Sequence, residues 1–256
     1  MDELKEKSVL ITGASSGLGE GVAYTFARNG SSLAICGRNE ETLAMVRDKC
    51  NAEGAKKVVC TIADLENVED MNRIVEETVS SLGGIDILIN NAGLVNLATF
   101  EQATVEDLDK LFKVNLRAPY YLTQQCLPHL KISKGCIVNI SSVASSVIFP
   151  EFLHYSMTKT ALDHFTKSTA LELAKYGIRV NSVRPSAIDT PILRRTLSEK
   201  SEQLMDEYGK QNPLGRCLLS IQEIAETVIF LSTSESKCIT GACLATDRGR
   251  ALCGQL

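Results

Sequence analysis

One tyrosine and one lysine have a spacing that could support proton transfer. Of the six tyrosines in the chain, only Tyr155 is followed by a lysine four residues later, at Lys159. The segment 154–174 has the apolar spacing of a helix, on which positions i and i+4 share one side. An ammonium beside a phenol stabilises the phenolate and lowers a pKa that is about 10 in isolation. The pair is a candidate acid–base site, with a simple surface contact as the alternative.

A second candidate is the glycine-rich stretch GASSGLG at positions 13–19, which follows the apolar run 8–12. Glycines let backbone N–H groups approach a phosphate, and the start of a helix adds positive potential. A first strand-to-helix turn of this kind is typical of dinucleotide sites, although the spacing G-x3-G-x-G differs from G-x-G-x-x-G. An ordinary turn is the alternative. The predicted cofactor contacts here are Gly13, Ser15, Ser16, Gly17, Leu18 and Gly19.

The end of the second apolar run, 32–36, bears on the choice of cofactor. A site for NAD needs a carboxylate there, to accept a hydrogen bond from the ribose 2′-hydroxyl. In this chain Cys36 and Gly37 end the run and Arg38 follows, and a guanidinium can hold a 2′-phosphate through paired hydrogen bonds. We therefore predict NADP(H), with NAD(H) as the alternative if Arg38 only points into water. Ser16 supplies no second basic partner.

The remaining composition argues against several other classes. The nine cysteines include no C-x-x-C pair and the three histidines lack zinc spacing, so we predict no metal site and read the cysteines as small apolar side chains. A net charge of −4 gives no reason to expect nucleic acid or membrane partners. No apolar run approaches the ~20 residues that span a bilayer, and no signal-peptide pattern opens the chain. We expect a cytoplasmic location.

The candidate residues fall where short β-branched runs meet longer helical patterns. Runs expected to be strands are 8–12, 32–36, 57–62, 85–89, 136–140 and 178–183, with helical patterns at 18–28, 40–52 and 68–82. This alternation predicts an α/β fold, a Rossmann-type doubly wound parallel sheet of about seven strands with helices on both faces.

We expect one domain, because no linker or repeat interrupts residues 1–256. Within it, the range 185–215 interrupts the alternation of strands and helices. Pro185, Pro191, Pro213 and Gly215 surround the charged helical stretch 193–210. This range is a candidate lid over a substrate, with a solvated surface helix as the alternative.

Further motifs complete a pattern with the two candidate sites. They are Asn90 to Gly93 (NNAG), Asn115 in LFKVNL, Ser142 thirteen positions before Tyr155, residues 181–185 (NSVRP), and residues 239–241 (ITG) followed by Asp247. Along essentially the whole chain, these motifs together resemble the short-chain dehydrogenase/reductase family. Overall the chain is similar to its 3-oxoacyl-carrier-protein reductases and carbonyl reductases.

The resemblance implies a role for each residue. Tyr155 exchanges a proton with a carbonyl or alcohol oxygen, and Lys159 lowers the pKa of Tyr155 and holds the nicotinamide ribose. Ser142 hydrogen-bonds the substrate oxygen, and Asn115 holds a water that relays protons to Lys159. Further implied cofactor contacts are Asp64, Leu65, Asn91, Ile188 and Thr190. A homo-oligomer, most often a tetramer, is implied, paired through the expected helices 104–130 and 152–176.

Three positions depart from the family pattern. Ser186 and Arg248 stand where glycines are usual, and Ser16 stands where many NADP-using relatives carry a basic residue. Two other functions stay open. One is a catalytically silent dinucleotide sensor. The other is an epimerase or dehydratase of nucleotide sugars, although such relatives are longer chains with an added substrate domain. The apolar stretch 142–155 suits a lipophilic carbonyl, a ketoacyl chain or a steroid-like ketone.

Overall fold

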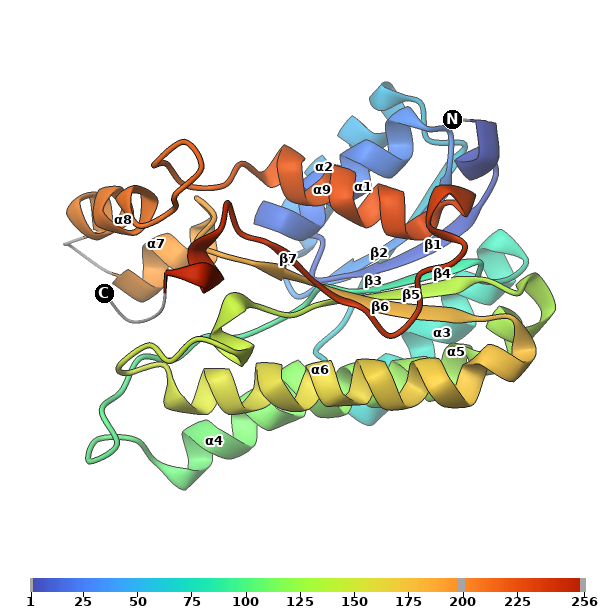
Figure 1. Ribbon diagram of the computed structural model, residues 1–256. Coiled ribbons are helices and arrows are strands. Elements are labelled where there is room, and N and C mark those ends of the chain that lie inside the picture. The colour runs from blue at the N-terminus through green and yellow to red at the C-terminus, as the bar shows by residue number, and fades with distance from the viewer. Residues whose placement is uncertain (1, 198–200, 254–256) are drawn as a thin grey trace.

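The computed structural model describes residues 2–197 and 201–253. Its centre is a seven-stranded parallel sheet in the order β3-β2-β1-β4-β5-β6-β7 (Figure 1). The strands are β1 Ser8–Thr12, β2 Ser32–Gly37, β3 Lys57–Ile62, β4 Ile87–Asn90, β5 Cys136–Ile140, β6 Arg179–Pro185 and β7 Cys243–Thr246. The predicted Rossmann-type, doubly wound parallel sheet is confirmed.

Helices cover both faces of the sheet, as expected when parallel strands are joined by crossovers. They are α1 Gly17–Arg28, α2 Glu40–Glu53, α3 Val68–Leu82, α4 Val105–Phe112, α5 Ala118–Ser133, α6 Leu153–Leu173, α7 Pro191–Leu197, α8 Ser201–Lys210 and α9 Ile221–Ser232. None of the described helices is both long and apolar enough to cross a bilayer.

Two apolar cores separate the layers. One lies between the sheet and α1, α2 and α9, where Phe26, Leu43 and Val228 are fully buried. The other lies between the sheet and α3, α5 and α6, where Ile74, Leu122 and Leu173 pack together. Figure 1 shows these two groups of helices above and below the sheet. β1, β4 and β5 are buried along their whole length, which explains why they appear as continuous apolar runs in the sequence.

The strand order reverses between β1 and β4. At such a point the connections from the two strands leave in opposite directions, so a crevice opens at their carboxyl ends. The glycine turn follows β1, and the Asn91 to Gly93 segment follows β4. The fold therefore brings both motifs to one crevice.

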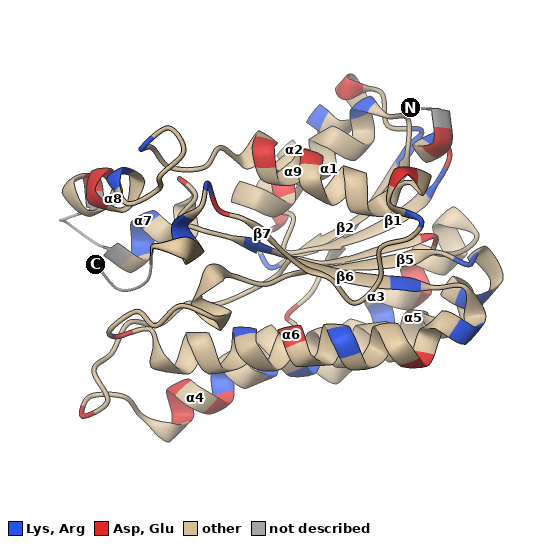
Figure 2. Ribbon diagram, in the orientation of Figure 1, with Lys and Arg blue, Asp and Glu red and all other residues tan. Residues whose placement is uncertain are grey.

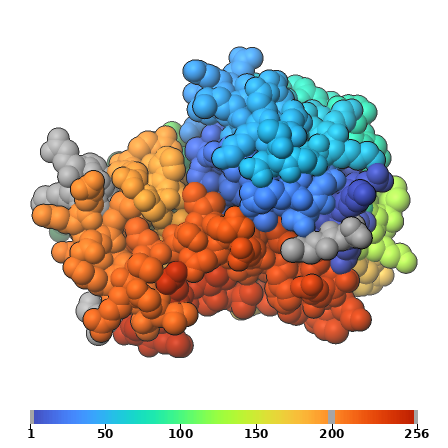
Figure 3. Space-filling model, turned by 90° about the horizontal axis from the view of Figure 1, so that it is seen from above, coloured from blue at the N-terminus to red at the C-terminus, as the bar shows by residue number. Residues whose placement is uncertain are grey.

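Two expected helices are divided. The expected helix 104–130 consists of α4 and α5 joined by a π-helical turn, Lys113–Arg117. The charged stretch 193–210 contains α7 and α8, and residues 198–200 between them lie outside the described residues. Seen from above, this part of the chain projects at one end of the molecule (Figure 3).

Candidate active site

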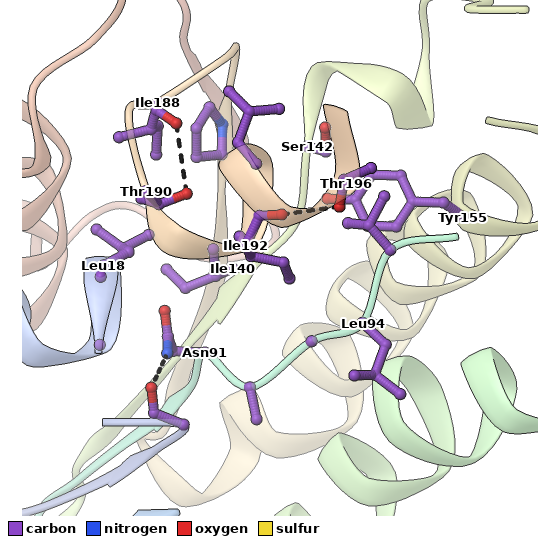
Figure 4. Close-up of a pocket in the computed structure, with 18 of the residues that line it drawn as sticks. Leu18, Asn91, Leu94, Ile140, Ser142, Tyr155, Ile188, Thr190, Ile192 and Thr196 are labelled. Atoms are coloured by element: carbon purple, nitrogen blue, oxygen red, sulfur yellow. Dashed lines mark hydrogen bonds between the residues drawn. The ribbon is translucent and has the colours of Figure 1, made fainter. Parts of the chain in front are cut away.

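A long cavity follows the carboxyl ends of the strands and contains almost every residue singled out in the sequence. All fourteen predicted cofactor contacts line it, and so does Ser142. Asn115 is the exception and lies behind the wall. Figure 4 shows Leu18 and Asn91 toward one side of the cavity and Ser142 and Tyr155 toward the other. The structure thus brings the glycine turn and the Tyr155–Lys159 pair into one continuous space.

The glycine turn has the backbone conformation that glycine favours. Gly13 and Gly17 have φ of +66° and +62°, in the left-handed region. A Cβ on Gly13 would lie 2.8 Å from the Cα of Ala92, so the turn after β1 touches the segment after β4. Because α1 begins at Gly17, its first N–H groups lie beside the cavity and supply positive potential for an anionic group.

Asn91 joins the two strand ends. Its side-chain amide donates to the carbonyls of Thr12 and Gly13, at 2.8 and 3.1 Å. In return the hydroxyl of Thr12 accepts hydrogen bonds from the backbone N–H groups of Asn91 and Ala92, both at 3.0 Å. These hydrogen bonds fix the segment after β1 to the segment after β4 at the base of the crevice.

Arg38 lies where β2 meets α2. Gly37 ends the strand, and a Cβ at Gly37 would lie 3.0 Å from the side chain of Ser15. Asn39 then caps α2, since its side chain accepts from the N–H of Thr42 at 2.9 Å. Arg38 is thereby fixed between a strand end and a helix cap, lining the cavity with Ser15 and Ser16. The described lining contains one carboxylate, Asp64, which follows β3 rather than β2.

Tyr155 and Ser142 come from different elements. Ser142 follows β5 and begins a 3₁₀ turn, where its hydroxyl accepts from the N–H of Ala144 at 3.1 Å. Tyr155 lies in the first turn of α6. Burial raises the pKa of Tyr155 to about 12, and a hydrogen bond with Ser142 opposes that rise. The phenol is therefore neutral at pH 7 and able to donate its proton.

Lys159 lies one helical turn after Tyr155 and is 3% exposed. Its ammonium donates to the carbonyl of Ile140 at 2.7 Å and lies 5.5 Å from the centre of the Tyr155 ring. Burial lowers the pKa of Lys159 to about 8, while the negative charge of Asp163 opposes the shift. The spacing of Tyr155 and Lys159 predicts that the ammonium lowers the pKa of the phenol. Burial raises the pKa of Tyr155 instead, and the Lys159 ammonium donates to the Ile140 carbonyl.

Asn115 is fully buried in the π-helical turn. Its side chain accepts from the N–H of Leu94 at 2.8 Å and donates to the carbonyl of the same residue at 2.9 Å. The amide also donates to the hydroxyl of Thr158 at 3.1 Å. A Cβ at Gly93 would lie 3.5 Å from the Asn115 carbonyl oxygen and 3.6 Å from the Lys159 ammonium. Gly93 therefore leaves space between the two side chains.

Comparison with known proteins agrees with this geometry. A family profile described as enoyl-(acyl carrier protein) reductase matches residues 13–251. The chain is 34% identical to glucose 1-dehydrogenase of Gluconobacter oxydans, over 99% of this chain and 95% of that protein. It belongs to the short-chain dehydrogenase/reductase family.

Solved structures of family members have the same fold. The 3-ketoacyl-(acyl-carrier-protein) reductase of Brucella melitensis, solved with NADH, is 32% identical, with a TM-score of 0.89 over 97% of this chain and 99% of that one. A short-chain dehydrogenase/reductase of Caenorhabditis elegans, solved with cofactor, is 34% identical, with a TM-score of 0.91 over 98% of this chain and 97% of that one.

Two departures from the family pattern meet at one segment. The hydroxyl of Ser186 donates to the Asn212 side chain at 3.3 Å, and Asn212 donates to the carbonyl of Cys217 at 2.8 Å. Arg248 donates to the carbonyl of Leu214 at 3.1 Å, and its own carbonyl accepts from the N–H of Leu214 at 3.0 Å. Side chains at two usual glycine positions thus fasten the chain that follows α8.

Sequence reasoning missed several lining residues at the substrate end. Phe149, Phe152, Tyr208 and Arg250 all line the cavity near Tyr155. Apolar spacing around Ser142 pointed to the two phenylalanines as a group. No sequence signal marked Tyr208 or Arg250, because Tyr208 lies on α8 and Arg250 in a 3₁₀ turn that only the tertiary fold brings to the cavity.

Proposed function

We propose that this protein is an oxidoreductase that interconverts a carbonyl and a secondary alcohol, with Tyr155 as the general acid and base. The observation that carries the proposal is the half-buried phenol of Tyr155 beside Ser142, in the same cavity as the glycine turn. A nicotinamide cofactor, when bound, supplies the hydride to the carbonyl carbon. The Tyr155 hydroxyl donates its proton to the carbonyl oxygen, and in the reverse direction the phenolate takes the alcohol proton.

The other residues position the substrate at Tyr155 and return a proton to its phenol. Ser142 donates a hydrogen bond to the substrate oxygen and aligns it with the phenol. With a cofactor bound, Lys159 would hold the ribose hydroxyls and, as a nearby cation, would favour the phenolate. Asn115 and Lys159 flank the space beside Gly93, where a water can return the proton to the phenol. The buried and fixed Asn115 amide supports this relay.

The test is turnover of a panel of carbonyl compounds with NADPH, followed by the absorbance of the reduced cofactor. Tyr155→Phe should lower kcat at least ~100-fold while cofactor binding persists, because proton transfer of this kind contributes roughly 10²–10⁴-fold. A Phe variant that keeps more than about a tenth of the rate would refute the assignment of Tyr155. A wild-type chain that binds cofactor and reduces nothing would favour the dinucleotide sensor.

We further propose that NADP(H) is preferred over NAD(H). Arg38 lies in the lining between Gly37 and the capped start of α2, and the carboxylate that NAD recognition needs is absent from the end of β2. The measurement is kcat/KM with each cofactor for the wild type and for Arg38→Asp. The wild type should favour NADPH, and the Asp variant should shift toward NADH, since a carboxylate repels the 2′-phosphate. A wild-type preference for NADH would contradict the proposal.

The remaining assignments are proposals of the same kind. Residues 1–256 act as one catalytic domain, and 185–215 forms a lid over the substrate. The chain works in the cytoplasm on a small carbonyl or alcohol, as a carbonyl reductase. It pairs into a homotetramer through the helices at 104–130 and 152–176. An apolar groove between α4, α5 and α6, with half-exposed Tyr120 against Phe165, supports the pairing.

A further inference from the structure

Asp163 is a buried carboxylate one helical turn after Lys159. Both residues lie on α6, and each is 3% exposed. Because positions i and i+4 share one side of a helix, Tyr155, Lys159 and Asp163 follow one another along the same side of α6. Figure 2 shows positions of both signs of charge along this helix. A negative charge therefore lies near the buried ammonium, on the side away from Tyr155.

Contacts with strand β6 fix the Asp163 carboxylate. The hydroxyl of Ser182 donates to Oδ1 at 3.0 Å. The guanidinium of Arg184 donates from Nε to Oδ2 at 2.7 Å, and its Nη2 lies 2.7 Å from the same oxygen. A buried carboxylate is costly unless it is paired and hydrogen-bonded, and these contacts give each of its oxygens a partner. The negative charge is thus held at a fixed place in the core.

The ammonium of Lys159 has a weaker electrostatic environment. Its hydrogen bond is to the neutral carbonyl of Ile140, at 2.7 Å. Burial lowers the pKa of Lys159 to about 8, and the negative charge of Asp163 opposes that shift. The ammonium form therefore exceeds the neutral amine by only about tenfold at pH 7. A further fall of about one unit in this pKa would make the two forms equally abundant at that pH.

Asp163 differs in charge from the other groups around the pair. The charged or titratable side chains that face Lys159 and Asp163 are Tyr155 and Lys167 on α6, Arg184 on β6 and Cys243 on β7. The two basic residues are cations, which disfavour a second positive charge nearby. Burial raises the pKa of the phenol to about 12 and also raises the pKa of the thiol, so both groups are neutral at pH 7. Among these neighbours, the carboxylate is the group that can retain the proton of Lys159.

We propose that Asp163 is a positioning residue for the reaction: its carboxylate, fixed on β6, keeps Lys159 in the ammonium form that favours the Tyr155 phenolate and helps to return its proton. This inference rests on the proposed function and adds a residue that lies outside the cavity lining. The alternative is a structural tie between α6 and β6, which would not depend on the charge of Asp163.

The first test follows proton release by Lys159 in the cofactor-free protein. Asp163→Asn removes the charge and keeps the shape, since the amide oxygen can still accept from Arg184. For each protein, urea denaturation gives the free energy of unfolding relative to its Lys159→Met counterpart. This difference rises above the pH at which folded Lys159 releases its proton. The rise should begin near pH 8 in the wild type and about one pH unit lower in Asp163→Asn, the smaller end of the usual effect of an opposite charge.

Ser182→Ala is the matched control, because it removes one contact between Asp163 and β6 without changing a charge. It should leave the pH of proton release unchanged. The same pH in the wild type and in Asp163→Asn would overturn the inference, and so would an equal fall in Ser182→Ala. If Asp163→Asn does not fold, Asp163→Asn combined with Arg184→Met decides, since it leaves neither partner buried and unpaired. This double variant should also release the Lys159 proton at lower pH, and an unchanged pH would overturn the inference.

The second test is the pH dependence of kcat/KM for carbonyl reduction with NADPH. Because the ammonium form of Lys159 is lost as pH rises, the alkaline limb should move to lower pH in Asp163→Asn and stay in place in Ser182→Ala. A limb that stays in place in Asp163→Asn, although Lys159 releases its proton at lower pH, would overturn the role in the reaction. A wild type that reduces no carbonyl would contradict the proposed function, whereas the unfolding comparison decides the effect of Asp163 on Lys159 without turnover.

Discussion

Removing the Lys159 ammonium should change how the stability of the protein depends on pH. The side chain is 3% exposed, and burial lowers its pKa from 10.5 to about 8 despite the opposing charge of Asp163. Methionine has a similar length and no charge, so Lys159→Met removes the titration while filling most of the same space. The comparison is made on the cofactor-free protein.

The sign follows from where the proton is held. Below pH 8 both the folded and the unfolded chain keep the Lys159 proton, and the folded state bears the full cost of a buried cation. Between pH 8 and 10.5 the unfolded chain keeps the proton and the folded chain loses it, so the free energy of unfolding rises with pH. A shift from 10.5 to about 8 corresponds to about 3 kcal/mol in all. Between pH 7 and pH 9.5 the rise is about 2 kcal/mol.

Urea denaturation at one protein concentration measures the effect across that pH range. We expect the free energy of unfolding of the wild type to rise, relative to that of Lys159→Met, by about 2 kcal/mol from pH 7 to pH 9.5. Lys167→Met removes an exposed lysine from the same helix and controls for the loss of one positive charge. A difference that stays constant from pH 7 to pH 9.5 would refute the argument that burial dominates the ionisation of Lys159.

Two further predictions concern the glycine turn and the assembly. Gly13→Ala should destabilise the protein at least about 1 kcal/mol more than Gly83→Ala in urea denaturation. Both glycines have positive φ, but only Gly13 would bring a Cβ within 2.8 Å of Ala92, whereas nothing lies within 4 Å at Gly83; equal losses would speak against the contact. Light scattering should give a mass about four times the 27.8 kDa of one chain, and a monomer at micromolar concentration would count against the helix pairing.

The fold was largely predictable because its determinants are local. Each buried strand is a short apolar run, and α2 and α3 begin at side-chain caps, Asn39 and Asn67. The glycine turn was predictable for the same reason, since the spacing of Gly13, Gly17 and Gly19 is itself the structural requirement. Alternation of strand and helix then sufficed to predict a doubly wound parallel sheet, whose strand order the structure gives.

The substrate end was less predictable because it depends on contacts between distant parts of the chain. Arg250 stacks on Phe149, which lies far earlier in the chain, and Asn115 faces inward because a π-helical turn interrupts the expected helix 104–130. The pKa of Tyr155 also escaped prediction. Spacing alone suggested a neighbouring cation, whereas burial raises the pKa of Tyr155 and the Lys159 ammonium donates to the Ile140 carbonyl.

Two of the three departures from the family pattern, Ser186 and Arg248, lie beside the segment that follows α8. Arg248 adopts a φ of +53°, a conformation that costs an arginine about 1 kcal/mol or more. The cost of this conformation is offset by an ion pair between Arg248 and Glu223 at 2.7 Å and by the two hydrogen bonds between Arg248 and Leu214. Ser186 fastens Asn212 in the same segment.

A fastened segment after α8 has a consequence for selectivity. Arg248 and Asp247 belong to the turn that carries Arg250, so the bonds to Leu214 also fix the turn that presents the guanidinium to the cavity. The cofactor end, by contrast, keeps the family's glycines. In this chain, side chains at two positions where glycine is usual therefore fasten the segment that follows α8 and the turn that carries Arg250, and it is at such sites that members of one fold differ in what they bind.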